Sequence, residues 1–320
     1  MNIIDQSFIF HNCLTLRKQA EGVAVCRFSE AQLAVYAQDE ALRLRSCCPS
    51  GSCLDFVTDA TEVVISYQVG KACRNWLNFD LLIDGIMVGT AGGSVEIPGI
   101  QQVQFELGNG RKHVTLYLPH TVELLLSAVE LPAGAMVAAA PRHQQNLLCL
   151  GDSITQGMDA RHPAAIYPVL LARFLELNLL NQAVGGYHFH PDSLDETLDY
   201  RPDLITVAYG TNDWGHQFPM DAIERNCRAY LQRLTGIFPN VPVKLITPIW
   251  RQDHQEKRPA GTLSGVIALI AHVAAGFPQI QIVRGWELVP QLPEYFGDGR
   301  LHPNDEGFAR LALGLVQRMR

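Results

Sequence analysis

The sequence predicts an α/β protein in which a parallel sheet covered by helices follows a smaller antiparallel β-sandwich. In the first half, short runs alternate between apolar and polar residues with a period of two, as in half-buried strands. In the second half, short apolar runs alternate with longer segments of helical periodicity. With 320 residues, 48% of them hydrophobic, the chain is long enough for two cores. We place the sandwich at residues 1–135, a linker at 136–145 and the α/β domain at 146–320.

The strands expected in the sandwich are short and rich in β-branched and aromatic residues. They are TEVVISYQV (61–69), NFDLLIDGIMVGT (78–90), VQFEL (103–107) and HVTLYL (113–118). Asp84-Gly85 and Gly108-Asn109-Gly110 lie between such runs, where we expect hairpin turns. Many short strands separated by turn signals, with little helical pattern, favour a β-sandwich.

The segment LPAGAMVAAAPRHQQ (131–145) breaks this rhythm. It contains small residues and two prolines, and no charged residue precedes Arg142. We interpret it as the junction, an extended segment that crosses between the domains.

After the junction, strands and helices alternate. The expected strands are NLLCL (146–150), LLNQAV (179–184), DLITVAYG (203–210), VPVKLITPIW (241–250) and IQIV (280–283). The expected helices cover 164–177, with a proline in the first turn, 222–234, 262–276 and 305–319, the last capped by Asn304 or Asp305. Such alternation predicts a parallel sheet with helices on both faces.

Reactive groups in such sheets collect beyond the carboxyl ends of the strands. Ser153 follows the first strand, Gly186 the second and Asn212 the third, while His302 lies in the loop before the last helix. The fold therefore brings these four residues, far apart in the sequence, to one edge of the sheet.

These residue types are the ones that acyl transfer needs. Ser153 is the candidate nucleophile and His302 the base that takes its proton. The backbone N–H groups of Ser153 and Gly186 and the side-chain amide of Asn212 can stabilise an oxyanion. Asp298 is the nearest carboxylate that could orient the imidazole. Taken alone, Ser153 could simply cap a helix, but the three partners favour the nucleophile.

Four motifs carry a resemblance to a known family: GDSIT with Ser153, the glycine of NQAVGG, GTND with Asn212, and DGRLHPN with His302. In this order they resemble the SGNH hydrolases, also called the GDSL esterase/lipase family, over residues 146–320. The resemblance implies a flavodoxin-like three-layer domain and an esterase, lipase, thioesterase or carbohydrate deacetylase activity. A β-sandwich (jelly-roll-like) before this domain resembles the arrangement in some carbohydrate acetyl esterases of the family. The elbow motif G-x-S-x-G of α/β-hydrolases is absent from the sequence.

The sequence departs from the family pattern at one point. The family spaces its acid and base as D-x-x-H, whereas three residues separate Asp298 from His302. Gly299 could absorb the additional residue, or Asp298 points away and a Ser–His dyad remains. The oxyanion glycine is also ambiguous between Gly185 and Gly186, and counting from Asn181 favours Gly186.

Aromatic residues follow the strand ends and are candidate substrate contacts, although many aromatic residues are merely core. The candidates are Tyr187, His188, Trp214 and Trp250. Two metal sites are conceivable, at His188, His190 and Asp192 and at the cysteines of CCPSGSC (47–53). Neither has a full ligand pattern, and we expect no metal and no cofactor.

The net charge of −7 disfavours nucleic acid as a partner. The first residues show no secretion signal, no run spans a membrane, and the eight cysteines suit a reducing compartment, so we expect a cytoplasmic protein. We predict a serine esterase that removes short acyl groups, preferably acetyl, from a carbohydrate or similar small alcohol. A thioesterase or lysophospholipase and a non-catalytic carbohydrate-binding protein are the alternatives. The sequence leaves homo-oligomerisation and the role of the sandwich open.

Overall fold

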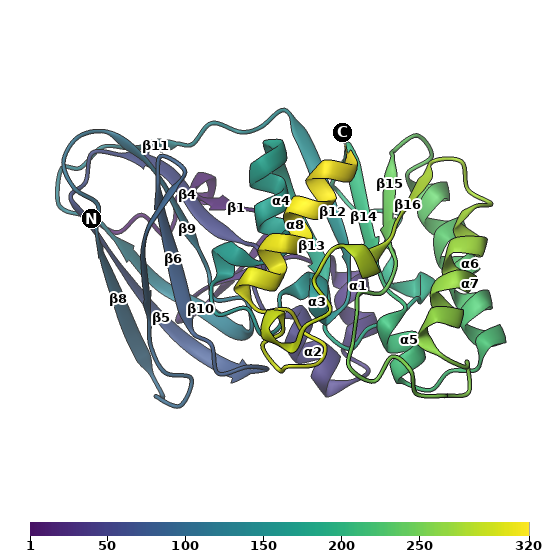
Figure 1. Ribbon diagram of the computed structural model, residues 1–320. Helices are drawn as coiled ribbons and strands as arrows, with labels where there is room; N and C mark the ends of the chain where they lie inside the picture. Colours follow the sequence, from purple (N-terminus) through teal and green to yellow (C-terminus); the bar gives the residue numbers. More distant parts are fainter. Residues whose placement is uncertain (320) are drawn as a thin grey trace.

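The computed structural model describes residues 1–319, in which an antiparallel β-sandwich lies beside a parallel α/β domain (Figure 1). One sandwich sheet has the order β1-β4-β9-β6-β7, with β11 paired to β4, and the other has the order β2-β3-β10-β5-β8. Their strands are β1 (Phe10–His11), β2 (Thr15–Gln19), β3 (Gly22–Cys26), β4 (Cys53–Thr58), β5 (Glu62–Ala72), β6 (Asn78–Ile83), β7 (Ile86–Gly92), β8 (Ile100–Glu106), β9 (Lys112–Tyr117), β10 (Val122–Glu130) and β11 (Val137–Ala139). The predicted β-sandwich is confirmed.

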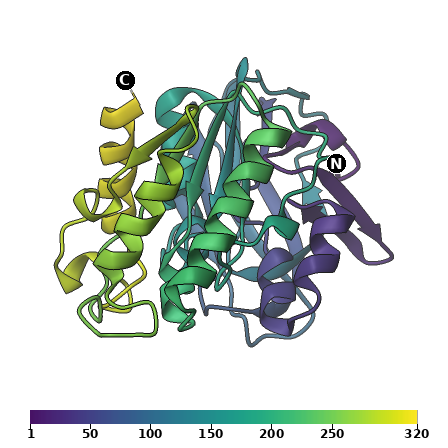
Figure 2. The ribbon, with the colours of Figure 1, turned by 90° about the vertical axis from the view of Figure 1, so that its right-hand side faces the viewer.

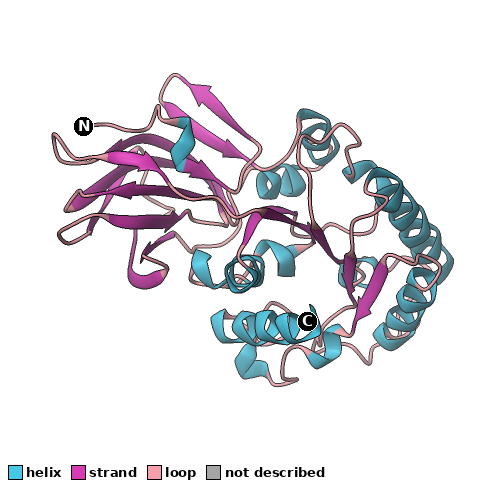
Figure 3. Ribbon diagram, turned by 90° about the horizontal axis from the view of Figure 1, so that it is seen from above, coloured by secondary structure: helices cyan, strands magenta, loops and turns pink. Residues whose placement is uncertain are grey.

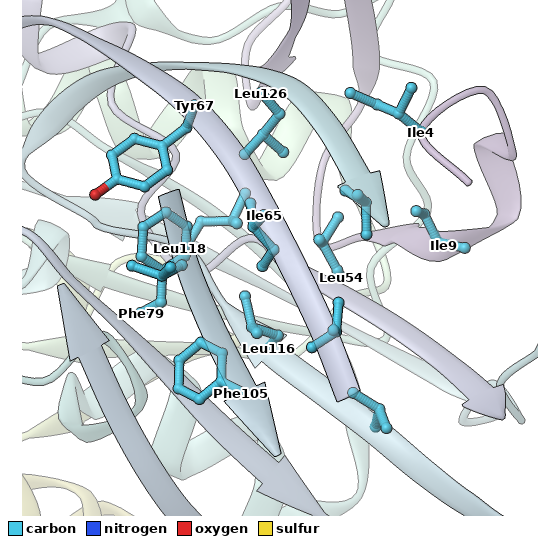
Figure 4. Close-up of a cluster of buried hydrophobic side chains, with 14 of the residues drawn as sticks. Ile4, Ile9, Leu54, Ile65, Tyr67, Phe79, Phe105, Leu116, Leu118 and Leu126 are labelled. Atoms are coloured by element: carbon cyan, nitrogen blue, oxygen red, sulfur yellow. The ribbon is translucent and has the colours of Figure 1, made fainter. Parts of the chain in front are cut away.

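Apolar side chains from both sheets fill the space between them. Ile65 and Leu126 from one sheet meet Phe79 and Leu116 from the other, and all four are almost completely buried (Figure 4). Because successive side chains of a strand point to opposite faces, the two-residue period of the sequence puts every second residue into this core.

The two predicted hairpin turns differ in outcome. Asp84 and Gly85, with φ of 49° and 79°, connect the paired strands β6 and β7, as predicted. The prediction of a hairpin at Gly108-Asn109-Gly110 was wrong, because β8 pairs with β5 whereas β9 pairs with β4 and β6. This turn carries the chain from one sheet to the other.

Two short helices, α1 (Glu30–Tyr36) and α2 (Glu40–Ser46), interrupt the sandwich between β3 and β4 and were not predicted. Ser29 and Gln32 form a reciprocal capping box at α1, and Asp39 caps α2. This S-x-x-Q pattern was the available sequence signal. The helices pack against the α/β domain, where the rings of Tyr36 and Tyr187 lie 5.0 Å apart.

The junction is not a free linker. Residues 137–139 form β11, which pairs antiparallel with residues 56–58 of β4 before the chain enters the α/β domain.

The second domain contains a five-stranded parallel sheet of order β13-β12-β14-β15-β16. Its strands are β12 (Gln145–Gly151), β13 (Leu177–Ala183), β14 (Leu204–Ala208), β15 (Val243–Ile246) and β16 (Ile280–Val283). In chain order this is the 2-1-3-4-5 arrangement of flavodoxin-like folds, whose order reverses between β12 and β14. The predicted fold class is confirmed.

Helices cover both faces of this sheet (Figures 2 and 3). They are α3 (Ser153–Gln156), α4 (Tyr167–Leu175), α5 (Thr211–Gly215), α6 (Met220–Ile237), α7 (Leu263–Ala274) and α8 (Asp305–Met319). Helices α4 and α8 pack on one face, and α6, α7 and α1 pack on the other. Pro168 lies in the first turn of α4, and Asn304 caps α8 by accepting the N–H of Gly307 at 3.0 Å. Within residues 1–319, every helix is too short or too polar to cross a bilayer.

Candidate active site

The candidate site lies beyond the carboxyl ends of three neighbouring strands. Gly151, the last residue of β12, pairs with Ala183 of β13 on one side and with Ala208 of β14 on the other. Ser153, Gly186 and Asn212 each follow one of these strand ends by a few residues. The topology therefore gathers them at the point where the strand order reverses.

The side chains of Ser153, His302 and Asp298 form a continuous hydrogen-bonded chain. The Oγ of Ser153 lies 2.9 Å from Nε2 of His302, and Nδ1 of His302 lies 2.8 Å from Oδ2 of Asp298. An ionised carboxylate only accepts, so Nδ1 carries the proton and Nε2 is left to accept from the serine hydroxyl. This is the arrangement that general-base activation of a serine requires.

The loop that carries His302 folds around the Asp298 carboxylate. Oδ1 of Asp298 accepts the backbone N–H groups of Arg300, Leu301 and His302 at 2.8 to 3.1 Å. Gly299 has a φ of +70°, a conformation that accommodates the additional residue between the acid and the base. Burial opposes the charge of Asp298, but the hydrogen bonds from His302, Leu301 and Arg300 outweigh it and hold its pKa well below the usual value.

The candidate oxyanion donors lie in the three segments that follow β12, β13 and β14. The N–H of Gly185 is already used, because it donates to Oε1 of Gln156 at 2.7 Å. Among residues 1–319, the N–H groups of Gly186, which has a φ of +81°, and of Ser153 meet no acceptor. Nδ2 of Asn212 donates one hydrogen to the carbonyl of Tyr187 at 2.8 Å, which fixes the amide against the glycine loop. The second hydrogen of Nδ2 can then be donated to an oxyanion. These groups fit an oxyanion hole.

Two buried carboxylates underlie this edge of the sheet. Oδ1 of Asp152 accepts the N–H of Ile154 at 2.9 Å and so caps α3. The Asp213 carboxylate accepts the N–H groups of Gly210 and Phe189. Burial raises the pKa of each carboxyl to about 7, and the charge of Asp213 adds to the shift at Asp152. Both side chains hold the backbone rather than face the serine.

A second carboxylate near His302 was not predicted. Oδ2 of Asp159 lies 3.5 Å from Nδ1 of His302, and Oδ1 pairs with the guanidinium of Arg74 from the sandwich. Asp159, Asp298 and His302 are also close enough together to hold a metal ion. Nδ1 of His302 is already hydrogen-bonded to Asp298. We therefore interpret the three side chains as an arrangement that orients the imidazole and not as a metal site. No sequence pattern distinguished Asp159 from other loop aspartates.

The sandwich also supports the glycine loop. Arg27 is 1% exposed, and its guanidinium donates to the carbonyls of Asn181 and Ala183 at the end of β13 and to those of Arg45 and Cys48. Nη1 of Arg45 donates to the carbonyl of Gly185 at 2.9 Å. Arg27, which precedes α1, and Arg45 of α2 thus hold the backbone between the end of β13 and Gly185.

The predicted substrate contacts occupy different environments. Trp214 is fully buried, its Nε1 donates to the carbonyl of Gly261 at 2.9 Å, and the guanidinium groups of Arg251 and Arg258 cover its ring. This burial argues against the prediction that Trp214 contacts a substrate, because no face of its ring is free. Trp250 is 8% exposed and packs on Phe296, with ring centroids 4.9 Å apart.

His188 and Tyr187 lie closer to the candidate oxyanion donors. Tyr187 is largely buried, while His188 is half-buried and packs against His216 and Phe218. Burial, with the neighbouring His216 and His190, lowers the pKa of His188 to about 4, so this ring is neutral at ordinary pH. The uncharged ring of His188 could therefore hydrogen-bond a substrate without adding a positive charge to the site.

An open groove of about 710 Å³ lies beside Asp298 at the junction of the two domains. Its lining includes Arg74, Trp76, Asp159, Arg161, Phe296 and Asp298. Both domains thus contribute to the surface next to the histidine loop.

Comparison with known proteins agrees with this fold. The family model of the GDSL-like lipase/acylhydrolase family matches residues 149–310. No curated protein matches the sequence.

Several solved structures share the whole two-domain fold. The salicylyl-acyltransferase SsfX3 from a tetracycline biosynthetic pathway superposes with a TM-score of 0.81 at 21% identity, covering 97% of this chain and 93% of its own. A protein described as a GDSL-like lipase from Bacteroides ovatus superposes with a TM-score of 0.80 at 18% identity, and the match covers 100% of this chain and 96% of that protein. The acetyl xylan esterase Est2A from Butyrivibrio proteoclasticus superposes with a TM-score of 0.68 at 16% identity, and the match covers 100% of this chain and 98% of the esterase chain. On the family match, this chain belongs to the GDSL-like lipase/acylhydrolase family and is a carboxylic ester hydrolase.

Proposed function

We propose that this protein is a serine esterase that removes short acyl groups, acetyl foremost, from a carbohydrate or similar small alcohol. The observation that carries the proposal is the hydrogen-bonded chain from Ser153 Oγ through His302 to Asp298, with distances of 2.9 and 2.8 Å. A nucleophile, a base and an orienting acid in this order are the requirements of acyl-enzyme chemistry.

In the first half-reaction, Oγ of Ser153 attacks the ester carbonyl carbon while Nε2 of His302 takes the hydroxyl proton. The carbonyl oxygen becomes an oxyanion that accepts from the N–H groups of Ser153 and Gly186 and from Nδ2 of Asn212. When the tetrahedral intermediate collapses, the bond to the alcohol oxygen breaks and His302 protonates the leaving alcohol. The acyl group is then esterified to Ser153.

In the second half-reaction, water attacks the acyl-enzyme and gives one proton to His302. The intermediate collapses, the bond to Ser153 Oγ breaks, and His302 returns the proton to the serine. The products are the carboxylic acid and the free enzyme. Asp298 holds the imidazole in the required tautomer and stabilises its positive charge in both half-reactions.

The substrate class is supported by the relatives and by the surface near His302. Structures of similar fold include an acetyl xylan esterase and family two carbohydrate esterases, one of them in complex with cellohexaose. The groove beside Asp298 is lined by Arg74, Arg161 and Asp159 together with Trp76 and Phe296. Charged side chains beside an aromatic face suit a sugar with several hydroxyl groups.

The test is hydrolysis of p-nitrophenyl acetate by the purified protein and by Ser153→Ala. We expect the variant to lose at least about 10³-fold in kcat/KM, because the proposed acyl-enzyme cannot form without the Ser153 hydroxyl. Ser264→Ala is the matched control, since Ser264 is exposed on α7. Equal, slow hydrolysis by the wild type and Ser153→Ala would show that the protein is not a serine esterase and would favour a binding function.

The substrate is tested with p-nitrophenyl esters of increasing chain length and with a panel of acetylated sugars. A preference for acetyl over octanoyl esters, with acetate released from specific ring positions, is expected. A preference for octanoyl esters or for acyl thioesters would favour the lipase or thioesterase alternatives.

Transfer of the acyl group to an alcohol is a second candidate activity. The structural similarity to a salicylyl-acyltransferase over both domains favours it. Transfer uses the same acyl-enzyme, and an alcohol replaces water in the second half-reaction. Added alcohols that increase release of p-nitrophenol and yield a new ester would support transfer, whereas acetate as sole product would support hydrolysis.

A further inference from the structure

The loop before β6 and the start of β6 contact a short segment of the α/β domain, residues 159–164. Side chains at every second position from 74 to 80 contact this segment in order. Arg74 forms an ion pair with Asp159, and the Trp76 ring lies 5.0 Å from the Arg161 guanidinium. Asn78 Nδ2 donates to the Arg161 carbonyl at 3.0 Å. The Asp80 carboxylate lies 3.0 Å from His162 Nδ1 and accepts the N–H of Ala164 at 2.9 Å. The sandwich therefore fixes the position of segment 159–164.

The opposite side of segment 159–164 contacts the loop that carries His302. Oδ1 of Asp305, at the start of α8, accepts the N–H groups of Arg161 and His162 at 2.9 and 3.3 Å. A Cβ at Gly297 would lie only 2.7 Å from Cβ of Asp159, so only glycine allows this approach. The segment thus lies between the sandwich and the histidine loop.

Asp159 is the residue of this segment that reaches His302. Its carboxylate is 11% exposed, and Oδ2 lies 3.5 Å from Nδ1, the atom that Asp298 also approaches at 2.8 Å. Its backbone has a φ of +70°, a conformation that costs energy for a residue with a side chain. Arg74 binds the other oxygen, Oδ1, and so leaves Oδ2 facing the ring.

We propose that Asp159 is a positioning residue that shares His302 with Asp298, and that Arg74 of the sandwich domain holds Asp159 in that position. The sandwich is then part of the catalytic machinery and not only a docked domain. This inference rests on the proposed serine esterase mechanism, in which His302 becomes positively charged.

Several charged groups act on the His302 ring. Asp298 comes from its own loop, and Asp159 comes from the loop after α3, with Arg74 of the sandwich behind it. Ser153 of α3 faces Nε2. Both carboxylates lie beside the positive charge that His302 acquires in the proposed mechanism, and Arg74 pairs with Asp159 behind them.

The test compares the pH profiles of kcat/KM for the wild type, Asp159→Asn and the control Asp221→Asn. Asparagine tolerates a positive φ at least as well as aspartate, so the first variant keeps the backbone. We expect its plateau to fall about tenfold and its acidic limb to move to lower pH, because the ring loses one neighbouring negative charge. Asp221→Asn removes an exposed carboxylate of α6, outside the site, and should leave the limb unmoved.

Arg74→Gln tests the positioning role of Arg74. Without the guanidinium, Asp159 is no longer held beside Nδ1 of His302, and the acidic limb is expected to move to lower pH, as in Asp159→Asn. If the acidic limb of the kcat/KM profile of Asp159→Asn coincides with that of the wild type, Asp159 has only a structural role. If Arg74→Gln leaves the acidic limb unmoved or shifts it to higher pH, Asp159 keeps its place without Arg74 and the positioning role of Arg74 is refuted.

A measurement without substrate separates this inference from the proposed function. NMR titration of the His302 ring should show the midpoint displaced to lower pH in both Asp159→Asn and Arg74→Gln. An inactive wild type with these displacements would refute the esterase proposal but retain the coupling. An active wild type with unchanged midpoints in both variants would refute the coupling alone.

Discussion

The side chain of Gln156 in α3 accepts the backbone N–H of Gly185 at 2.7 Å and so ties the serine helix to the glycine loop. The next residue, Gly186, has a φ of +81° and keeps its N–H free of any acceptor within residues 1–319. The two glycines are adjacent in sequence, but one N–H stabilises the fold and the other is available for an oxyanion. Their substitution should therefore have different consequences.

Gly186→Ala is expected to lower kcat about 10²-fold. A Cβ there would lie 2.7 Å from Nη1 of Arg45 and would be strained at positive φ, so the N–H would leave its position. Gly185→Ala is the matched comparison, because its Cβ would meet only the flexible ends of Met158 and Arg45 and the side chain of Gln156. Steady-state kinetics on a short-chain ester measure both. A larger loss in Gly185→Ala would reverse the assignment.

Asp298→Asn is expected to lower kcat by about 10² to 10⁴-fold. An amide at this position can still accept backbone N–H groups, but it no longer fixes the Nδ1–H tautomer of His302. Thermal unfolding should confirm that the variant folds. Asp221→Asn, on the exposed face of α6, serves as the control. Wild-type activity in Asp298→Asn would indicate a Ser–His dyad.

Arg27→Met is expected to reduce the free energy of unfolding by about 3 to 5 kcal/mol, because the four carbonyls that Arg27 binds would lose their donor. Burial lowers the pKa of Arg27 to about 10, so the guanidinium remains charged at neutral pH. Urea unfolding monitored by circular dichroism measures the change. Arg225→Met on the surface of α6 should be neutral, and an equally small effect at Arg27 would contradict the assigned role.

The buried carboxyl of Asp152 should make stability depend on pH. An unfolded aspartate titrates near pH 4, whereas burial raises the pKa of Asp152 to about 7 in the folded protein. The stability associated with the protonated form is fully present below about pH 4 and is lost as the pH rises through about 7. The free energy of unfolding should therefore fall over this interval.

Asp152→Asn tests this dependence, because the amide oxygen can still accept the N–H of Ile154 but does not ionise. Between about pH 5 and about pH 8, urea unfolding should show a smaller loss of stability in the variant than in the wild type. Asp221→Asn should follow the wild type. Parallel curves for Asp152→Asn and the wild type would rule out the assigned titration.

Trp214→Phe is expected to lower stability by about 1 kcal/mol and to leave KM unchanged. The variant loses the hydrogen bond to Gly261 and weakens the contacts with Arg251 and Arg258. Kinetics and thermal unfolding on the same samples separate these effects. A several-fold rise in KM without loss of stability would restore Trp214 as a substrate contact.

Local patterns were sufficient for most elements of the α/β domain. Apolar runs bounded by turn residues predicted β12 to β16, and helical periodicity predicted α4, α6, α7 and α8. The turn at Gly108-Asn109-Gly110 was misjudged because turn residues specify a reversal of the chain but not which strands pair across it. Helices α1 and α2 were missed although Ser29 and Gln32 form a capping signal.

Residue patterns alone were enough to predict the alternation of strands and helices, and with it the edge of the sheet near which Ser153, Gly186, Asn212 and His302 lie. These properties follow from side-chain periodicity and from the rule that parallel strands end at one edge. Only the tertiary structure decided that Asp298 reaches His302 across the additional residue, that Trp214 is enclosed, and that Arg74 and Asp159 approach the same ring. The distance between two side chains from separate segments depends on how whole domains pack, and no local pattern encodes that packing.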